Sequence, residues 1–525
     1  MADIENVPRK KTRTGDLISL PRRGSSVADV EDAVARKQHT GYVSLSIVGG
    51  EKNAEQRSRM QKLTLQDIHK GLPSNACIDD RDVIWASDDL LFVGEGLRTN
   101  LLGIRSALAT DSFKTRKIAV VADVFDRRES RPYLESVFRL ITDDITVMLE
   151  EVIVPPLRRL VSEYVKDEDG NYVMTRHDVD FCQYVHENGY RVVPVHSHEK
   201  IHSFTPSMIT IQQSTNHVLM VAPTAFESNI AAAVDNHFMA GSTDGIAASG
   251  AELQRKVLQE FSVLHALISQ KAKVQVHLFT HEAHHDTPDA VFPNNWFSTH
   301  TNLEVGECTL VLYPMKVPNR RKERRPEFIN RLMGFRRYTR IVDLTHQEVA
   351  SDRPAFLEGT GSLVLDRIRR VGYLAISERS DEELAHTWAK HLNYRMVTFH
   401  AKDGAGRLIY HTNVMMCVGT SVAVVCSESV EDPTERKALL DSLSEHHALV
   451  EITRKQMDQF CGNVLELEDW RGRPVMVMSS AAHRAFTPEQ RALLLKHERE
   501  LIHADISTIE KVGGGGVRCA IAELF

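Results

Sequence analysis

The chain has 525 residues, of which 42% are hydrophobic and 26% charged, a composition ordinary for a soluble globular protein. Its formal net charge of −7 provides no basic field to attract nucleic acid or anionic lipid, so we expect neither as a partner. No apolar run reaches the roughly 18–20 residues that span a bilayer, and we expect no secretory signal. Seven scattered cysteines without a CxxC pair favour a reducing compartment, so we expect a cytoplasmic protein with no membrane partner.

Residues 1–25 are polar and low in apolar content, and we expect them to form a disordered tail. Residues 26–212 are expected to form an N-terminal α/β region. In it, helix formers with spaced apolar positions predict helix within 132–165. Short apolar runs bounded by polar turns predict strands at 82–85, 90–94, 190–195 and 208–211.

A second unit is expected over residues 213–525. Its predicted strands are 218–221, 275–279, 308–313 and 421–426, and its predicted helices are 248–271 and 487–502. Such alternation predicts an α/β architecture. No GxGxxG motif follows the first strand, so dinucleotide binding has no support.

Two stretches of this unit place a carboxylate beside a strand. The loop 288–298 presents Asp289 among aromatic and polar residues, although an ordinary turn with Asx hydrogen bonds would have the same composition. Glu358 precedes Gly359 and Gly361, and glycine permits a ligand to approach the backbone closely. Glu358 is therefore a candidate general acid or base, and the alternative is a loop carboxylate in water.

Two further stretches supply a histidine and a cysteine. His411 and Asn413 lie two residues apart, on one face of an extended strand, and taken alone they favour a half-buried hydrogen-bonded pair. Four glycines at 513–516 precede Arg518 and Cys519 and leave room for a substrate against the backbone. A neighbouring cation, Arg518 or protonated His411, would lower the pKa of the Cys519 thiol and make it a nucleophile. The alternative is a flexible turn with an inert thiol.

Taken together and in this order, these stretches resemble the amidinotransferase superfamily of guanidine-modifying enzymes, the penteins. Within it, the chain most resembles the citrulline-utilisation hydrolases. The resemblance covers about 218–525, and its motifs are 288–300, 313–315 with 319–321, 357–366, 410–416, 460–463 and 508–519. It implies a five-bladed α/β propeller with the site at its central axis.

The resemblance also implies roles for single residues. Cys519 matches the nucleophile, His411 the general acid/base, Glu358 the carboxylate that orients His411, and Asp289 the carboxylate that grips the substrate. No metal and no organic cofactor is required. We further expect four residues to contact the substrate: Asn295, Asn413, Arg320 and Arg518.

The implied function is a hydrolase that cleaves a C–N bond of a ureido or guanidino group, as in citrulline or arginine, through a covalent S-linked intermediate. Its partner would be a small, amino-acid-like substrate, and a homo-oligomer is left open. Arginine deiminases usually carry Asp where this chain has Asn413, which favours a neutral ureido substrate. An arginine deiminase or amidinotransferase on the same residues, and a non-catalytic scaffold propeller, are the alternatives.

Several other residues call for a separate interpretation. Residues 77–105 loosely resemble a stretch of the dimethylarginine dimethylaminohydrolases, with His202 as a matching histidine, so residues 74–212 would be an incomplete relative of the same fold. Cys417 and Cys426 are expected to be packed core thiols. The three histidines His281, His284 and His285 lack a complete ligand set and are expected on the surface.

Overall fold

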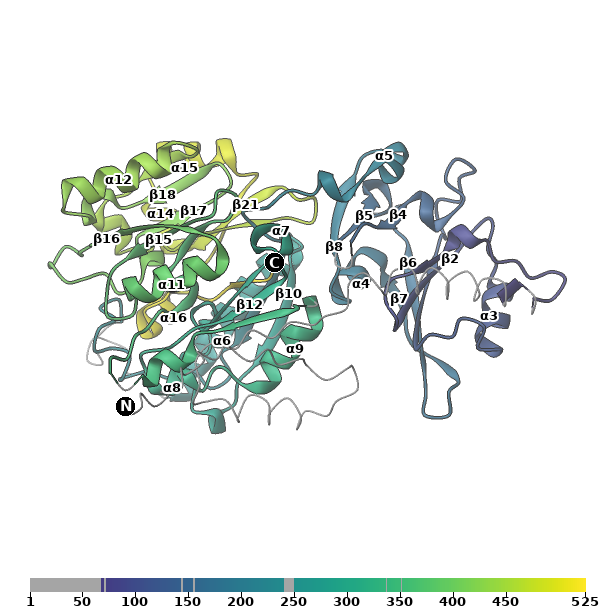
Figure 1. The fold of residues 1–525 in the computed structure, drawn as a ribbon, viewed down its shortest axis with the longest axis horizontal. Coiled ribbons are helices and arrows are strands. Elements are labelled where there is room, and N and C mark those ends of the chain that lie inside the picture. The colour runs from purple at the N-terminus through teal and green to yellow at the C-terminus, as the bar shows by residue number, and fades with distance from the viewer. Residues whose placement is uncertain are drawn as a thin grey trace, which may run out of the picture.

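The computed structural model describes residues 68–69, 72–142, 145–153, 156–239, 250–336, 338–350 and 352–525. The tail predicted at 1–25 and the start of the region 26–212 lie outside these residues. Figure 1 shows an N-terminal unit in purple and blue beside a larger unit in teal to yellow. Within the described ranges, no helix is long and apolar enough to cross a membrane.

Among its described residues, the N-terminal unit contains two sheets. The first has the order β1-β2-β3-β6-β7, with β1 Val83–Trp85, β2 Leu90–Glu95, β3 Lys117–Ala122, β6 Leu160–Lys166 and β7 Tyr172–Asp180. The second has the order β4-β5-β8, with β4 Phe138–Leu140, β5 Ile145–Leu149 and β8 Arg191–Val195. The helices are α3 Leu101–Ala109, α4 Phe181–Glu187 and α5 His198–Ser203.

Two local predictions for this unit are wrong. The described residues of the segment 132–165 form strands β4 and β5, most of β6 and two three-residue 3-10 helices, and no α-helix. All five residues of β5 are buried, since pairing with β4 and β8 places the strand inside the core and overrides helix propensity. The predicted strand 208–211 is absent: a 3-10 helix occupies Pro206–Met208, and Met208 is exposed.

The larger unit contains five three-stranded sheets among its described residues. Their strands are β9 His217–Ala222, β10 Gln275–Thr280 and β23 Ala522–Glu523; β11 Phe297–His300, β12 Thr309–Leu312 and β13 Arg340–Asp343; β14 Val364–Asp366, β15 Val371–Ala375 and β16 Arg395–Phe399; β17 Met416–Val418, β18 Val422–Val425 and β19 Ala448–Glu451; and β20 Leu465–Glu468, β21 Pro474–Ser479 and β22 Leu501–Ala504.

All five sheets share one pairing pattern. The central strand pairs antiparallel with one neighbour and parallel with the other, as β12 does with β11 and β13. In four sheets the strands follow each other in the chain. In the fifth, the C-terminal strand β23 pairs antiparallel with β9, so the two ends of the unit meet in one sheet.

The helices of this unit begin at sequence signals that explain their positions. Asp381 caps α11 by accepting a hydrogen bond from the Leu384 amide, and Asp432 caps α12 directly before Pro433. The helices are α6 Gly250–Ala266, α7 Asn302–Val305, α8 Pro318–Arg321, α9 Pro326–Arg336, α10 Gly359–Ser362, α11 Glu382–Leu392, α12 Pro433–Ser444, α13 Arg454–Met457, α14 Ser480–Ala485, α15 Pro488–His497 and α16 Ser507–Gly513. A mixed α/β fold is thus confirmed.

Candidate active site

The motifs found in the sequence occupy one recurring place in the fold. Each precedes the first strand of its sheet: Asp289 precedes β11, Glu358 precedes β14, and His411 precedes β17. In the remaining two sheets, Asn463 precedes β20 and Cys519 precedes β23. Five sheets built alike therefore present five polar motifs from equivalent positions.

Cys519 lies in the turn between α16 and β23 and is buried, with 4% of its surface exposed. Its Sγ accepts hydrogen bonds from Asn463 Nδ2 at 3.3 Å and from Asn413 Nδ2 at 3.5 Å. Burial raises the pKa of the Cys519 thiol above its usual value, although these two amides act to lower it. The neighbouring cation Arg518 acts to lower this pKa, as expected, but burial outweighs it and the pKa stays above its usual value.

His411 and Glu358 form a buried pair in which His411 Nε2 lies 2.8 Å from Glu358 Oε2. Burial acts to raise the pKa of Glu358, but Arg379 and His411 hold it below its usual value. Burial lowers the pKa of His411 below its usual 6.5 although Glu358 opposes the shift. At neutral pH the pair is therefore a carboxylate beside a neutral imidazole.

Gly361 allows these groups to pack closely. A Cβ atom at this position would lie 2.8 Å from His411 Nδ1 and closer still to Asn295 Nδ2, and real Cβ contacts are essentially never below 3.0 Å. Because Gly361 has no side chain, the backbone of α10 can pack directly against His411 and the Asn295 amide.

Asp289 and Asn295 present atoms without hydrogen-bond partners. Asp289 Oδ2 accepts a hydrogen bond from Asn229 Nδ2 at 2.8 Å, whereas Oδ1 has no partner. Asn295 Oδ1 accepts from Arg320 Nη1 at 2.8 Å, which identifies its Nδ2 as the donor, and this Nδ2 has no partner. Burial raises the pKa of Asp289. A buried polar atom without a partner costs free energy that a ligand can restore.

These residues line one small pocket that is partly open to solvent. Besides the predicted Cys519, His411, Asp289, Asn295 and Arg320, its lining includes Asn236, Arg379, Tyr410 and Gly513 to Gly515. Glu358 is not among the residues that line the pocket, but it contacts His411, which is. The pocket therefore brings together a thiol, an imidazole and a carboxylate.

The larger part of the chain matches a described family. Residues 222–525 match the family model described as N,N dimethylarginine dimethylhydrolase, eukaryotic. The chain belongs to this family. Residues 59–226 match a second model, described as arginine deiminase.

These matches confirm the guanidine-modifying superfamily inferred from the motifs. The family resemblance of each unit differs from the prediction. The motifs had suggested that the N-terminal unit resembles the dimethylarginine hydrolases and the larger unit the citrulline hydrolases, whereas the matching models are arginine deiminase for the first and dimethylarginine dimethylhydrolase for the second. No curated protein sequence matches the chain significantly.

Three solved structures illustrate the structural likeness. The first is ArgZ, an arginine dihydrolase from the ornithine–ammonia cycle in Cyanobacteria, with a TM-score of 0.44 and 18% identity over 58% of this chain and 40% of that chain. The second is unliganded AgrE, with a TM-score of 0.45 and 18% identity over 58% of this chain and 39% of that chain. The third is a dimethylarginine dimethylaminohydrolase variant as an adduct with S-methyl-L-thiocitrulline, with a TM-score of 0.41 and 16% identity over 59% of this chain and 100% of that chain. The chain thus spans 40% of the length of ArgZ. At TM-scores below 0.5, none of these likenesses by itself establishes a shared activity.

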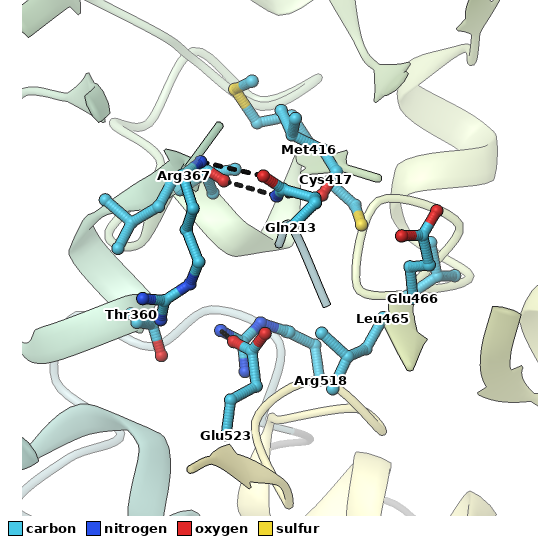
Figure 2. A pocket seen from close by; sticks show the side chains of 13 residues that line it. Gln213, Thr360, Arg367, Met416, Cys417, Leu465, Glu466, Arg518 and Glu523 are labelled. Atoms are coloured by element: carbon cyan, nitrogen blue, oxygen red, sulfur yellow. Dashed lines mark hydrogen bonds and ion pairs between the residues drawn. The ribbon is translucent and has the colours of Figure 1, made fainter. Parts of the chain in front are cut away.

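Two residues expected to contact the substrate, Arg518 and Asn413, are not among those that line the pocket. The Arg518 guanidinium donates to Ile521 O at 2.9 Å and to Glu523 Oε2 at 2.8 Å, and Arg518 lines a different cavity. Figure 2 shows Arg518 there with Glu523 and Gln213. Asn413 does not line the pocket either, and its Nδ2 donates a hydrogen bond to Cys519 Sγ.

Arg320, which we expected to contact the substrate, and its neighbour Arg321 already have partners within the protein. Arg320 pairs with Glu323 at 2.8 Å, and Arg321 donates to Met315 O at 2.9 Å. Arg379, which also lines the pocket, was not predicted from the sequence. Its Nε lies 3.1 Å from Asp235, and its Nη1 lies 3.4 Å from Glu358. No local motif marks Arg379, because only the fold brings it beside the pocket.

The histidine cluster differs in part from its prediction. His281 is buried, and its Nε2 accepts a hydrogen bond from the Ala225 amide at 3.0 Å, so it supports a loop rather than lying on the surface. His284 is exposed as expected. Among the described residues, no group of His, Cys, Asp and Glu is arranged to hold a metal ion. Cys417 and Cys426 are buried thiols, as predicted.

Proposed function

We propose that the chain is a cysteine-dependent hydrolase that cleaves a C–N bond of a guanidino or ureido group. The observation that carries this proposal is the unpartnered Asp289 Oδ1 in a pocket that Cys519 and His411 also line. Membership of the dimethylarginine dimethylhydrolase family favours an enzyme that acts on a C–N bond of a guanidino group.

The free atoms of the pocket complement both a guanidino substrate and its ureido product. Asp289 Oδ1 can accept an N–H of either group. Asn295 Nδ2 can donate to the oxygen that water introduces during hydrolysis, or to the carbonyl of a ureido substrate. A cationic guanidinium would also favour the ionised form of Asp289, whose pKa burial raises.

The proposed reaction starts from a neutral thiol and a neutral imidazole. His411 takes the Cys519 proton as Sγ attacks the planar carbon of the substrate, forming an S–C bond. The tetrahedral adduct collapses as the C–N bond breaks, and the departing nitrogen takes that proton and leaves as an amine or ammonia. His411 then deprotonates a water molecule that attacks the same carbon, and the C–S bond breaks to release product and thiol.

We further propose that residues 213–525 form the five-bladed propeller expected of the superfamily, preceded by the unit 26–212. Five alike sheets, and the pairing of β23 with β9, support a closed ring of sheets. In the N-terminal unit, β5 also pairs antiparallel with β4 and parallel with β8, the same pattern as one such sheet. This repetition supports an incomplete relative of the same fold.

The test is mass spectrometry of the purified protein incubated with arginine, dimethylarginine, citrulline and agmatine. We expect one of these to be turned over and to leave a covalent adduct on Cys519. Cys519→Ser should abolish turnover while the folded state persists, and Cys77→Ser, which removes an exposed thiol, should leave turnover unchanged. Turnover by Cys519→Ser, or no turnover and no adduct with any of the four compounds, would refute the proposal.

A further inference from the structure

Asn463 occupies a recurring motif position to which the proposed mechanism gives no role. It precedes β20 as Cys519 precedes β23, and only 1% of its surface is exposed. The turn before it is unusual, because Phe460 has a left-handed φ of 61°. A Cβ atom on Gly462 would lie 2.8 Å from Met415 Cα and even closer to Val414 O, so this turn lies directly against the turn that carries Asn413.

The orientation of the Asn463 amide is determined by its partners. Its Oδ1 accepts a hydrogen bond from the Arg518 backbone amide at 3.1 Å. Because a backbone N–H cannot accept, the opposite atom must be the Nδ2 donor group. That Nδ2 donates to Asn413 O at 2.9 Å and to Cys519 Sγ at 3.3 Å. One side chain thus connects the histidine-bearing turn, the cysteine-bearing turn and the reacting sulfur.

We propose that Asn463 is a catalytic residue that stabilises the thiolate form of Cys519 by a hydrogen bond from its amide. This inference rests on the proposed function, in which Cys519 is the nucleophile. A hydrogen bond to an ionised acceptor is stronger than one to a neutral acceptor, so the Asn463 amide favours the thiolate over the thiol. The mechanism needs this help, since burial disfavours a charged sulfur.

Other charged and titratable groups face the same sulfur. The pocket that Cys519 lines is also lined by Asp289, Arg320, Arg379, Tyr410 and His411. Arg518 precedes Cys519, but its guanidinium is paired with Glu523 at 2.8 Å. All of these groups remain when Asn463 alone is changed, so the comparison isolates the amide.

The experiment measures alkylation of Cys519 by iodoacetamide between pH 7 and about 10.5, since the thiolate is the reactive form. Trypsin cleaves after Arg518 and releases residues 519–525, a peptide that contains a single cysteine. The variants are Asn463→Ala, which removes the donor, and Asn463→Asp, which keeps the shape and places a carboxylate beside the sulfur. Asn393→Asp makes the same change at an exposed position and is the control.

We expect Asn463→Ala to raise the apparent pKa of Cys519 by about one unit, which slows alkylation roughly tenfold at a fixed pH below the midpoint. Asn463→Asp should slow it further, and Asn393→Asp should match the wild type. A merely structural role predicts the opposite order, because aspartate preserves the packing that alanine loses. That order, or alkylation by a folded Asn463→Asp variant within twofold of the wild type, would overturn the inference. Alkylation requires no substrate, so failure of the proposed function to find a substrate would leave this result standing.

Discussion

A methyl group added at Gly361 should inactivate the enzyme while leaving most of the fold in place. In Gly361→Ala the new Cβ would lie 2.8 Å from His411 Nδ1, and closer to Asn295 Nδ2. Both atoms must withdraw to at least 3.0 Å, the shortest separation that real Cβ atoms show. His411 is the proposed general base and Asn295 the proposed donor to the incoming oxygen, so one methyl group displaces two functional groups.

The size of the effect follows from this geometry. Displacing catalytic groups by a fraction of an ångström to about 1 Å can cost on the order of 10²-fold in rate. Overpacking of a buried site typically costs about 1–3 kcal/mol of stability. We therefore expect kcat to fall at least roughly thirtyfold, with a modest decrease in Tm.

The assay compares Gly361→Ala with Gly404→Ala by steady-state kinetics, on whichever substrate the wild type turns over, and by thermal unfolding. No atom lies within 4 Å of a Cβ placed on Gly404, so that variant should behave as the wild type does. If Gly361→Ala keeps kcat within threefold of Gly404→Ala, the close packing of His411 and Asn295 is not required for catalysis, and the assignment of both residues loses its structural support.

Three further predictions concern pH, substrate charge and the N-terminal unit. Burial, with Glu466 nearby, raises the pKa of Glu498 to about 10, so the folded state keeps a proton that the unfolded state releases above about pH 4.5. The stability of the folded state should therefore fall as pH rises between these two values. Because glutamine cannot release this proton, Glu498→Gln should increase Tm more at pH 8.5 than at pH 6. An equal change at both pH values would contradict this. Asn413→Asp should lower kcat/KM for citrulline and arginine alike, because the new carboxylate would face Cys519 Sγ. A tenfold increase in the ratio of kcat/KM for arginine to that for citrulline would instead indicate that residue 413 selects the substrate by its charge. A chain of residues 213–525 should keep measurable activity. It should also be more stable than a chain that begins at residue 217, because Gln213 Nε2 donates to Leu365 O at 2.7 Å and to Val418 O at 2.9 Å. A folded 213–525 chain without any activity would show that the N-terminal unit completes the site.

The sequence alone identified the candidate residues of the site. Cys519, His411, Glu358 and Asp289 were recognised because each lies in a short motif of glycines and polar residues beside an apolar strand, and the structure places all four together or in direct contact. Strongly apolar strands such as β9 and β18 were also predictable, because buried strands are continuous hydrophobic runs. Local patterns failed at β5, where burial between two neighbouring strands outweighs helix propensity.

Only the tertiary structure decided which groups meet at the sulfur and which do not. Arg518 is adjacent to Cys519 in the chain, yet its guanidinium points to Glu523 and the other cavity. Asn463 is 56 residues from Cys519 and its amide contacts Sγ. The net pKa of the thiol likewise depends on burial, which no local motif reveals. The physical reason is that desolvation and hydrogen-bond geometry depend on distances between separate sheets, whereas a motif describes only neighbours along the chain.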